Sequence, residues 1–435
     1  MTVVVGLLVA VVLIALLAVV HRYLWRRLVR DVSAPGGWWR RVGTVLAYVL
    51  PVLSLGAFVT RQAGTPFVVQ QALAWPGYLW MALLLYLLLA LWAGELVRLA
   101  LRRVEARRDA RVAEPEPEPE PASVPAGADA ETSSDAPAPD APAPDAPAPD
   151  APADPGPRVE DPARRLFVAR TLAVGATGVA AVTVGAGAYS VLNGPTVKRL
   201  TVPLAKLPRR AHGYRIAVVS DIHLGPVLGR SHCRRVVDTI NRTQPDLVAI
   251  VGDLVDGEVD DLGHAAAPLA DLESRHGSFF VTGNHEYFGD ADAWLDHLRG
   301  LGVHPLENAR RELPGFDLAG VNDVQGEAEG DGPDFDKALG DRDTSRASVL
   351  LAHQPVQIHD AVDHGVDLQL SGHTHGGQLW PGNYLAELAN PTVAGLERYG
   401  DTQLYVSRGA GAFGPPVRVG AESDVTVVTL ASKQA

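Results

Sequence analysis

Seven side chains able to bind metal ions recur in order through the second half of the chain. They are two carboxylates, four imidazoles and one amide: Asp221, His223, Asp253, Asn284, His353, His373 and His375. A centre for two divalent ions needs about eight oxygen and nitrogen donors, including a carboxylate that bridges the ions. These positions supply that kind of set. Because no thiolate is among the donors, the site could bind two divalent ions of Mn, Fe, Zn or Ni, and the sequence does not identify the metal.

Each group of donors follows a short apolar run that indicates a buried strand. The runs are 216–219, 247–251, 279–281, 349–351 and 368–370. Since side chains alternate along a strand with a period of two, Asp221 and His223 are expected to share one face, as are His373 and His375. Glycines at the same turns let the backbone approach a ligand closely. The sequence therefore predicts a site at the carboxyl ends of strands, where open α/β sheets bind ligands.

The motifs around these donors are SDIHLG, GDLVDG, GNHEY, AHQP and GHTHGG, in that order. Over about the last 240 residues the chain thereby resembles the calcineurin-like metallophosphoesterase superfamily. The resemblance implies an α/β fold, a calcineurin-like α/β/β/α two-sheet sandwich, and a metal-dependent phosphoric ester hydrolase. The hydrophobic pattern independently predicts strands that alternate with helices, such as those at 231–242 and 291–301.

The same resemblance implies roles for the donors. One metal would be held by Asp221, His223 and His375, the other by Asn284, His353 and His373, with Asp253 between them. A water shared by the two ions would be acidified toward hydroxide and attack phosphorus in line. His285 would face the substrate and protonate the leaving oxygen or stabilise its charge, and Asp256 would orient the ring. Beside its neighbour Asn284, His285 is not expected to reach the metals.

Other polar residues in this half of the chain are not predicted to bind a metal ion. The histidines outside the motifs are expected to be solvated: His264, His276, His297, His304, His359 and His364. Asp260, Asp261 and the acidic stretch 327–336 are expected in exposed loops. Arg408, in YVSRGAG, has two open interpretations. Its guanidinium fork suits a substrate phosphate, and it suits a structural carboxylate equally well.

The motifs also indicate which branch of the superfamily the chain resembles. In Ser/Thr protein phosphatases the segments that resemble GDLVDG and GNHEY contain arginines, whereas this chain has Gly257 and Tyr287 there. Protein phosphatase activity is therefore not expected. The stretches GHTHGGQ, AHQP and YVSRG instead resemble bacterial membrane-associated phosphoesterases of the superfamily.

Four long apolar stretches lie in the first half of the chain, at 2–20, 42–60, 78–94 and 171–197. A bilayer core about 30 Å thick needs about 20 apolar residues as a helix, so each is expected to span. The first lacks a basic start, which favours a permanent helix over a cleavable signal peptide. Arginines gather between the first two spans and after the third, so the positive-inside rule places those segments in the cytoplasm. The fourth span would then return the chain to the outside.

Arg164 and Arg165 precede the fourth stretch, and with Leu166 and Phe167 they resemble a twin-arginine export signal. The export machinery is therefore an expected partner, and the alternative is an ordinary basic flank of a membrane helix. Small residues that end at Ala188 resemble a cleavage site, so release from the membrane is left open.

These features predict four segments. They are a membrane region with three transmembrane helices at 1–103, a disordered Pro-, Ala-, Asp- and Glu-rich linker at 104–163, the twin-arginine-like fourth transmembrane segment at 164–197, and a metallophosphoesterase domain at 198–435. The linker alternates Glu and Pro at 114–121 and repeats APAPD at 136–150, which predicts an extended chain without a core. The net charge of −12 disfavours nucleic acid as a partner, and the single Cys233 excludes an intramolecular disulfide.

The sequence thus predicts a multi-pass protein of the cell membrane whose catalytic domain lies outside the cytoplasm. It would hydrolyse phosphomonoester, phosphodiester or diphosphate bonds by attack of a metal-bridging hydroxide. A lipid-linked or envelope phosphoester is the expected substrate, because the site would be held near membrane lipids. The alternative is a membrane scaffold or sensor whose phosphoesterase-like domain binds a ligand without turnover, and the complete donor set argues against it.

Overall fold

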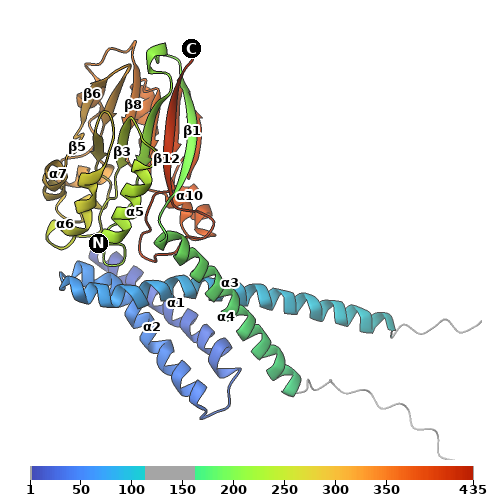
Figure 1. Ribbon diagram of the computed structural model, residues 1–435. Coiled ribbons are helices and arrows are strands. Elements are labelled where there is room, and N and C mark those ends of the chain that lie inside the picture. The colour runs from blue at the N-terminus through green and yellow to red at the C-terminus, as the bar shows by residue number, and fades with distance from the viewer. Residues whose placement is uncertain (1, 113–161, 435) are drawn as a thin grey trace, which may run out of the picture.

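The computed structural model describes residues 2–112 and 162–434, which form a helical region next to an α/β region (Figure 1). The helical region contains α1 (Thr2–Trp25), α2 (Trp38–Gln62), α3 (Phe67–Val112) and α4 (Pro162–Leu192). The Glu-Pro and APAPD repeats predicted to form a linker lie outside the described residues. Within the described residues, three helical stretches are long and apolar enough to cross a membrane: Trp38–Thr60, Phe67–Val104 and Ala163–Leu192.

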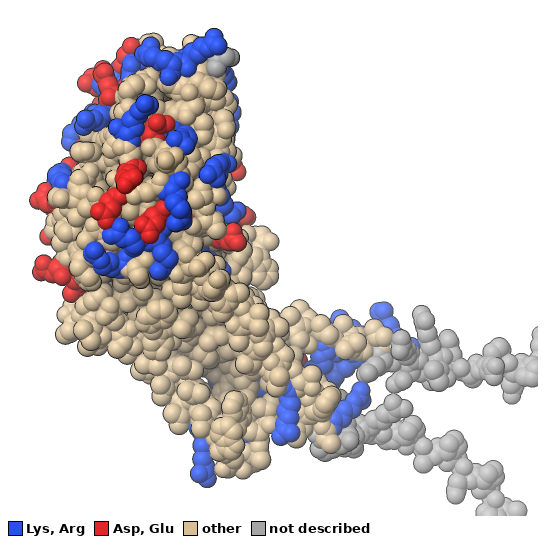
Figure 2. All heavy atoms as spheres, in the orientation of Figure 1, with Lys and Arg blue, Asp and Glu red and all other residues tan. Residues whose placement is uncertain are grey.

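The surface of the helical region differs from that of the α/β region. On the face shown in Figure 2, charged side chains are spread over the α/β region, whereas the adjoining helices present a wide surface with almost no charge. Lys and Arg reappear at the far ends of these helices. Such a band is the surface that a helix bundle presents to the hydrocarbon core of a bilayer.

The α/β region is built on two six-stranded sheets. The first has the order β1-β12-β2-β3-β4-β5 and the second β10-β11-β9-β8-β7-β6. Their bounds are β1 Thr196–Leu204, β12 Asp424–Ser432, β2 Tyr214–Val219, β3 Leu247–Val251, β4 Ser278–Val281 and β5 Val303–Pro305, and β10 Gly395–Tyr399, β11 Thr402–Val406, β9 Leu368–Ser371, β8 Ala347–Leu351, β7 Phe316–Gly320 and β6 Ala309–Leu313. Strands β2 to β5 are parallel, as are β7, β8, β9 and β11.

Helices cover the outer face of each sheet. Residues of the inner faces, such as Ile216, Phe279 and Leu351, form one apolar core between the sheets. On the first sheet, α5 (Arg230–Asn241), α6 (Val259–Ala266) and α7 (Ala291–Gly300) enclose a second core. On the other sheet, α8 (Phe335–Leu339) and α9 (Ile358–Asp363) enclose a third. The predicted α/β/β/α sandwich and its five predicted strands are confirmed, as are the predicted helices, which correspond to α5 and α7.

Three local expectations were wrong. The fourth apolar stretch does not stay helical to residue 197, because α4 ends at Leu192 and β1 begins at Thr196. Gly194, with a φ of 94°, and the proline after it end the helix. Asp260 and Asp261 form the first turn of α6, where the helix dipole favours acidic side chains. The stretch 327–336 is likewise not a plain loop, since a 3-10 helix (η5, Val324–Glu329) and the start of α8 occupy part of it.

Candidate metal centre

The metal-binding side chains predicted from the sequence lie in the turns that follow the parallel strands, but they do not continue the strands. Five of them have left-handed backbones, with φ of 50° at Asp221, 48° at His223, 51° at Asp253, 73° at His373 and 53° at His375. The period-two argument for the Asp-x-His and His-x-His pairs was therefore wrong, because side chains alternate only in extended backbone. Non-glycine residues in this region are strained, and such strain is typical of functional sites.

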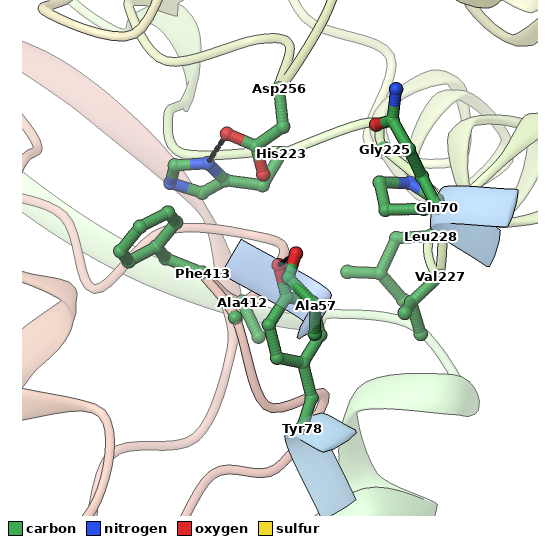
Figure 3. A pocket seen from close by; sticks show the side chains of 12 residues that line it. Ala57, Gln70, Tyr78, His223, Gly225, Val227, Leu228, Asp256, Ala412 and Phe413 are labelled. Carbon is green, nitrogen blue, oxygen red and sulfur yellow. Dashed lines mark hydrogen bonds and ion pairs between the residues drawn. The ribbon is translucent and has the colours of Figure 1, made fainter. Parts of the chain in front are cut away.

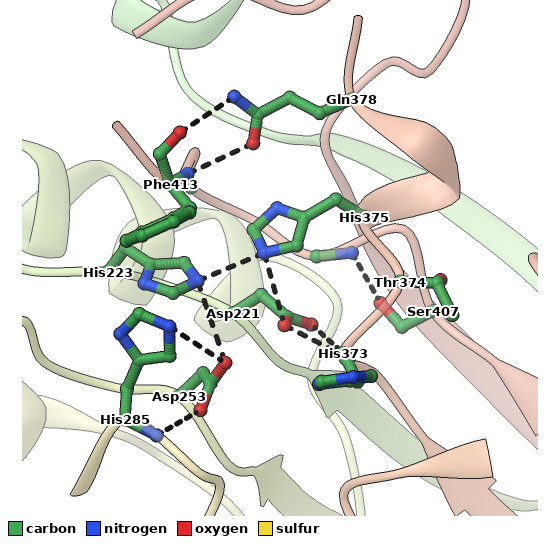
Figure 4. Close-up of polar contacts among 12 residues, drawn as sticks. Asp221, His223, Asp253, His285, His373, Thr374, His375, Gln378, Ser407 and Phe413 are labelled. Atoms are coloured by element: carbon green, nitrogen blue, oxygen red, sulfur yellow. Dashed lines mark hydrogen bonds and ion pairs between the residues drawn. The ribbon is translucent and has the colours of Figure 1, made fainter. Parts of the chain in front are cut away.

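The first group of donors joins the turns after β2 and β9 (Figure 4). Asp221, His223 and His375 are buried, and their ligand atoms lie within 4.8 Å of one another. The Nε2 atoms of His223 and His375 are 3.0 Å apart, and His375 Nε2 lies 3.4 Å from Asp221 Oδ1. Asp221 is itself fixed, because its carboxylate accepts the backbone N–H of His373. This group has the composition of a site for one divalent ion.

The second group lies around Asp253. His353 Nε2 is 3.2 Å from Asp253 Oδ2, and His373 belongs to the same set of atoms within 4.8 Å. Asn284 adjoins this set, with its Oδ1 3.0 Å from His373 Nδ1. The same Asp253 Oδ2 lies 3.8 Å from His223 Nε2, so this carboxylate connects the two groups.

The residues around Asp253 fit a bound divalent cation. His353 Nδ1 donates to the carbonyl of Val251 at 2.9 Å, which turns Nε2 toward Asp253, where it can hold a proton or bind a metal ion. Among the described residues this buried Nε2 has no partner with hydrogen-bond geometry, although Asp253 Oδ2 lies 3.2 Å from it, so a cation between the two atoms would satisfy both. Burial alone would raise the pKa of Asp253, but His353, His285 and His223 lower it well below its usual range. A Cβ on Gly283 would lie 2.3 Å from Asp253 Oδ1, so only glycine leaves room for this ligand.

His285 and Asp256 lie at the mouth of the centre. His285 Nδ1 donates to Asp256 Oδ1 at 2.6 Å, and the same oxygen lies 3.1 Å from His223 Nδ1. Burial would raise the pKa of Asp256, but the two histidines hold it far below its usual range. His285 Nε2 is 3.9 Å from Asp253 Oδ2, so its ring lies closer to the metal ligands than the sequence analysis expected. Phe413 packs against the rings of both His223 and His285.

Glu286 organises the turns but was not singled out from the sequence. Its buried carboxylate accepts four backbone N–H groups, from Gly283 at 2.7 Å, Leu254 at 2.9 Å, Asp253 at 3.0 Å and Val255 at 3.3 Å. It therefore ties the turn after β4 to the turn after β3. Burial, with Asp253 beside it, raises the pKa of Glu286 to about 7. Its only signal in the sequence is its place directly after the donors in GNHEY.

Arg418 was also missed. This buried guanidinium donates to the carbonyls of Gly411, His375 and Ala421, and it lies 3.1 Å from His375 Nδ1. Burial lowers the pKa of Arg418 to about 10. It therefore supports the turn that holds His375, and no motif letter near it indicates this role.

Arg408 lies outside the metal centre. It lines a separate groove of about 260 Å³ with Lys198, Arg199 and Asp424 between the β1–β12 and β10–β11 strand pairs. Asp424 pairs with Lys198 at 2.6 Å, and Arg408 makes no hydrogen bond or ion pair with any residue that the structure describes. Among the described residues no carboxylate partner accounts for Arg408, and its side chain lies against Gly376, the residue after His375. The phosphate-clamp role of Arg408 stays a prediction.

Three of the six histidines expected to be solvated are partly buried: His276, His297 and His364. His276 stacks on Tyr214 and its Nδ1 bonds the Tyr214 hydroxyl at 2.8 Å, and His297 packs edge-on against Trp294. His364 is half-buried against Phe335, whereas His264, His304 and His359 are exposed. A different histidine, His232 in α5, is fully buried, and neither of its ring nitrogens has a hydrogen-bond partner among the described residues.

The helical region forms part of the wall around the centre (Figure 3). A narrow cavity of about 20 Å³ is lined by His223, Asp256 and Phe413 from the α/β region and by Ala57, Gln70 and Tyr78 from α2 and α3. Val227, in the loop after β2, packs against the apolar cluster of Ala57, Ala74 and Tyr78. The mouth of the metal centre is thus closed in by helices that are apolar enough to cross a membrane.

A two-sheet sandwich with clustered carboxylates and imidazoles at the carboxyl ends of its strands defines a calcineurin-like phosphoesterase. Residues 214–377 match the family model for the calcineurin-like phosphoesterase. A protein of Aquifex aeolicus named an uncharacterized metallophosphoesterase is 36% identical over 254 residues, which cover 57% of this chain and 97% of that protein. The chain belongs to the calcineurin-like metallophosphoesterase family.

Longer relatives also match. A Danio rerio protein named a transmembrane protein with metallophosphoesterase domain is 39% identical over 259 residues, which cover 56% of this chain and 59% of that protein. An uncharacterized metallophosphoesterase of Helicobacter pylori is 39% identical over 250 residues, which cover 57% of this chain and 67% of that protein. The matched part spans only about six tenths of the Danio rerio protein.

Proposed function

We propose that this chain is a membrane-tethered phosphoesterase that uses two divalent metal ions. Family membership, the two adjoining groups of donors and the unpartnered His353 Nε2 support the proposal. Asp221, His223 and His375 would hold one ion, and Asn284, His353 and His373 the other, with Asp253 shared by both. When bound, two divalent ions make hydroxide available from water near neutral pH and neutralise charge on the phosphoryl oxygens.

His285 would act on the leaving group. Its Nδ1–H is committed to Asp256, so its Nε2 is the atom that can meet a substrate oxygen. Asp256 stabilises the protonated ring, as the carboxylate partner of a catalytic histidine does, so that Nε2 can donate to the leaving oxygen. Phe413 and Phe288 pack on the His285 ring and keep it in this orientation. Monoesters, diesters and diphosphates all offer such an oxygen.

The observation that favours a lipid-linked substrate is the origin of the pocket wall. Ala57 and Tyr78 reach the cavity from helices α2 and α3, so a phosphate group that arrives there is next to an apolar, membrane-type surface. A phosphoester with an acyl or polyprenyl chain can place the chain against these helices and the phosphate at His223 and His285. A soluble metabolite without such a chain would make no contact with the apolar surface of these helices.

The activity is tested with the full chain in lipid nanodiscs with Mn²⁺. Hydrolysis of p-nitrophenyl phosphate or its bis-ester is expected, with loss in Asp253→Asn. A parallel screen of phospholipids, polyprenyl phosphates and nucleotides is expected to favour the first two. Absence of turnover with Mn²⁺, Fe²⁺, Zn²⁺ and Ni²⁺ would refute the proposed phosphoesterase activity and favour the scaffold or sensor alternative. A preference for nucleotides would refute only the proposal of a lipid-linked substrate.

The proposed location of the catalytic domain is outside the cytoplasm, with export through the twin-arginine machinery. Arginines on the segments after the first and third spans support this orientation. Alkaline phosphatase fused after Ala435 should be active, and a fluorescent protein that matures only in the cytoplasm should stay dark there. Replacement of Arg164 and Arg165 by lysine keeps the basic flank but removes the export signal, so an unchanged location in this double variant would contradict the export route.

A further inference from the structure

Helix α10 (Gly382–Ala389) has no buried residue, although five of its eight residues are large and apolar or are alanine. The exposed fraction of its Leu388 is 84%, the highest of the large apolar side chains in the described part of the chain. Leu385 is 71% exposed and Tyr384 58%, and Trp380 just before the helix is 49% exposed. An exposed apolar patch of this kind marks a surface that is covered by something else.

The exposed residues share one side of the helix. At 100° per residue, Leu388 and Leu385 lie about 40° and 100° around the helix from Tyr384. Asn383 and Ala386 lie on the opposite side and are half-buried. That side packs on the turn His375–Gly377, because a Cβ on Gly377 would lie 2.3 Å from the Asn383 Cα. The helix therefore joins an apolar outer face to the turn that contains a metal-binding histidine.

The same segment is attached to the membrane-type helices. The Tyr86 hydroxyl of α3 donates to the Trp380 carbonyl at 3.1 Å. Leu379 and Val419 pack against the apolar cluster that α3 and α4 form through Leu87 and Ala180. In Figure 1, α10 lies at the end of the α/β region that adjoins α4. The apolar face of α10 is thus continuous with an interface that belongs to the helical region.

We propose that α10 and Trp380 form an interfacial anchor that lies in the plane of the bilayer surface, which rests on the proposed membrane tethering. An amphipathic helix of this kind buries its apolar face about 5–10 Å into the boundary between headgroups and acyl chains. Trp and Tyr are the side chains that favour this level of a membrane. The occupant of the exposed face is therefore lipid. Because α10 packs on the turn of His375, the anchor also sets the depth of the metal centre relative to the bilayer surface.

The single natural cysteine makes a direct test available, because Cys233 is fully buried. Leu388→Cys in the full chain is labelled with the fluorophore NBD and reconstituted in phosphatidylcholine nanodiscs. Lys433→Cys is the matched control, since the C-terminus lies at the end of the α/β region away from the helices (Figure 1). Unsubstituted protein measures any labelling of Cys233.

NBD at Leu388→Cys should emit at shorter wavelength than at Lys433→Cys and should lose most of its fluorescence when the nanodiscs contain doxyl lipids. Equal, water-like emission from both positions would overturn the proposal. A blue shift without quenching by doxyl lipids would overturn it as well, because the occupant would then be protein, either a second copy or another segment. Fluorescence does not depend on turnover, so an inactive enzyme with a quenched label would refute the proposed function and leave the anchor standing.

Discussion

Replacement of Glu286 by glutamine should loosen the metal centre although Glu286 is not itself a proposed ligand. At pH 8 the carboxylate is ionised, because its pKa is about 7. Each of its oxygens accepts two backbone N–H groups: Oε2 those of Asp253 and Gly283, and Oε1 those of Leu254 and Val255. In glutamine one oxygen becomes an NH₂ group, which cannot accept, so two buried donors lose their partner.

A buried donor without a partner costs about 1–3 kcal/mol, so Glu286→Gln should lower the free energy of unfolding by about 2–6 kcal/mol. For a domain of this size, 1 kcal/mol corresponds to about 2–4 °C, so the melting temperature should fall by roughly 4–24 °C. The variant should also bind Mn²⁺ about 10–100-fold more weakly, because the backbone that positions Asp253 is released.

Thermal unfolding of the full chain in detergent, followed by tryptophan fluorescence at pH 8 with EDTA, measures the stability without metal. Calorimetric titration with Mn²⁺ measures affinity in the same preparation. Glu422→Gln makes the same chemical change at an exposed position and should leave both values unchanged. A melting temperature of Glu286→Gln within about 2 °C of the unsubstituted protein would refute the reasoning, since two unpaired buried donors cannot cost so little.

Three other substitutions address separate features. Gly283→Ala places a Cβ 2.3 Å from Asp253 Oδ1 and should abolish Mn²⁺ binding in calorimetry, whereas Gly300→Ala, with open space around its Cβ, should not; equal affinities would contradict the steric argument. Burial, with Arg235 nearby, lowers the pKa of His232 to about 3. Between pH 6.5 and 3 the unfolded chain therefore takes up a proton that the folded chain does not, and the free energy of unfolding decreases by up to about 1.4 kcal/mol for each unit by which the pH is lowered. Melting curves of His232→Leu should fall less steeply with acidification, and parallel curves would count against this. Arg408→Lys should change neither the melting temperature nor the turnover of p-nitrophenyl phosphate, and a selective loss of turnover would support the phosphate-clamp interpretation.

The strands of the sandwich could be predicted because buried parallel strands are short apolar runs between glycine-rich turns. Runs such as Leu247–Val251 have no polar residue, and their short length and flanking glycine favour a strand in a covered sheet over a buried helix. The grouping of the donors came from the resemblance to the calcineurin-like family, which the five motifs carry. The left-handed backbone at Asp221 and His373 could not be predicted, because these residue types occur far more often in other conformations.

The supporting residues were harder to find because they act through backbone groups. Glu286 accepts N–H groups and Arg418 donates to carbonyls, and such contacts depend on the folded turns rather than on neighbouring letters. The contribution of Ala57 and Tyr78 to the pocket wall depends on how the helices dock against the loop at Val227, which local patterns do not specify.

The pairing of β1 with β12 has a consequence for the order in which the protein can be made. β12 lies between β1 and β2, and the buried Asp424 at its start bonds Lys198, which is 226 residues earlier in the chain. Until β12 has been synthesised, β1 and β2 have no common neighbour, and the edge strand β1 is separated from the other four strands of the first sheet. The catalytic region therefore completes its fold only after translation has passed residue 432. A ribosome that stalls earlier, or a protease that removes β12, would leave α4 in place with an unfinished sheet attached to it.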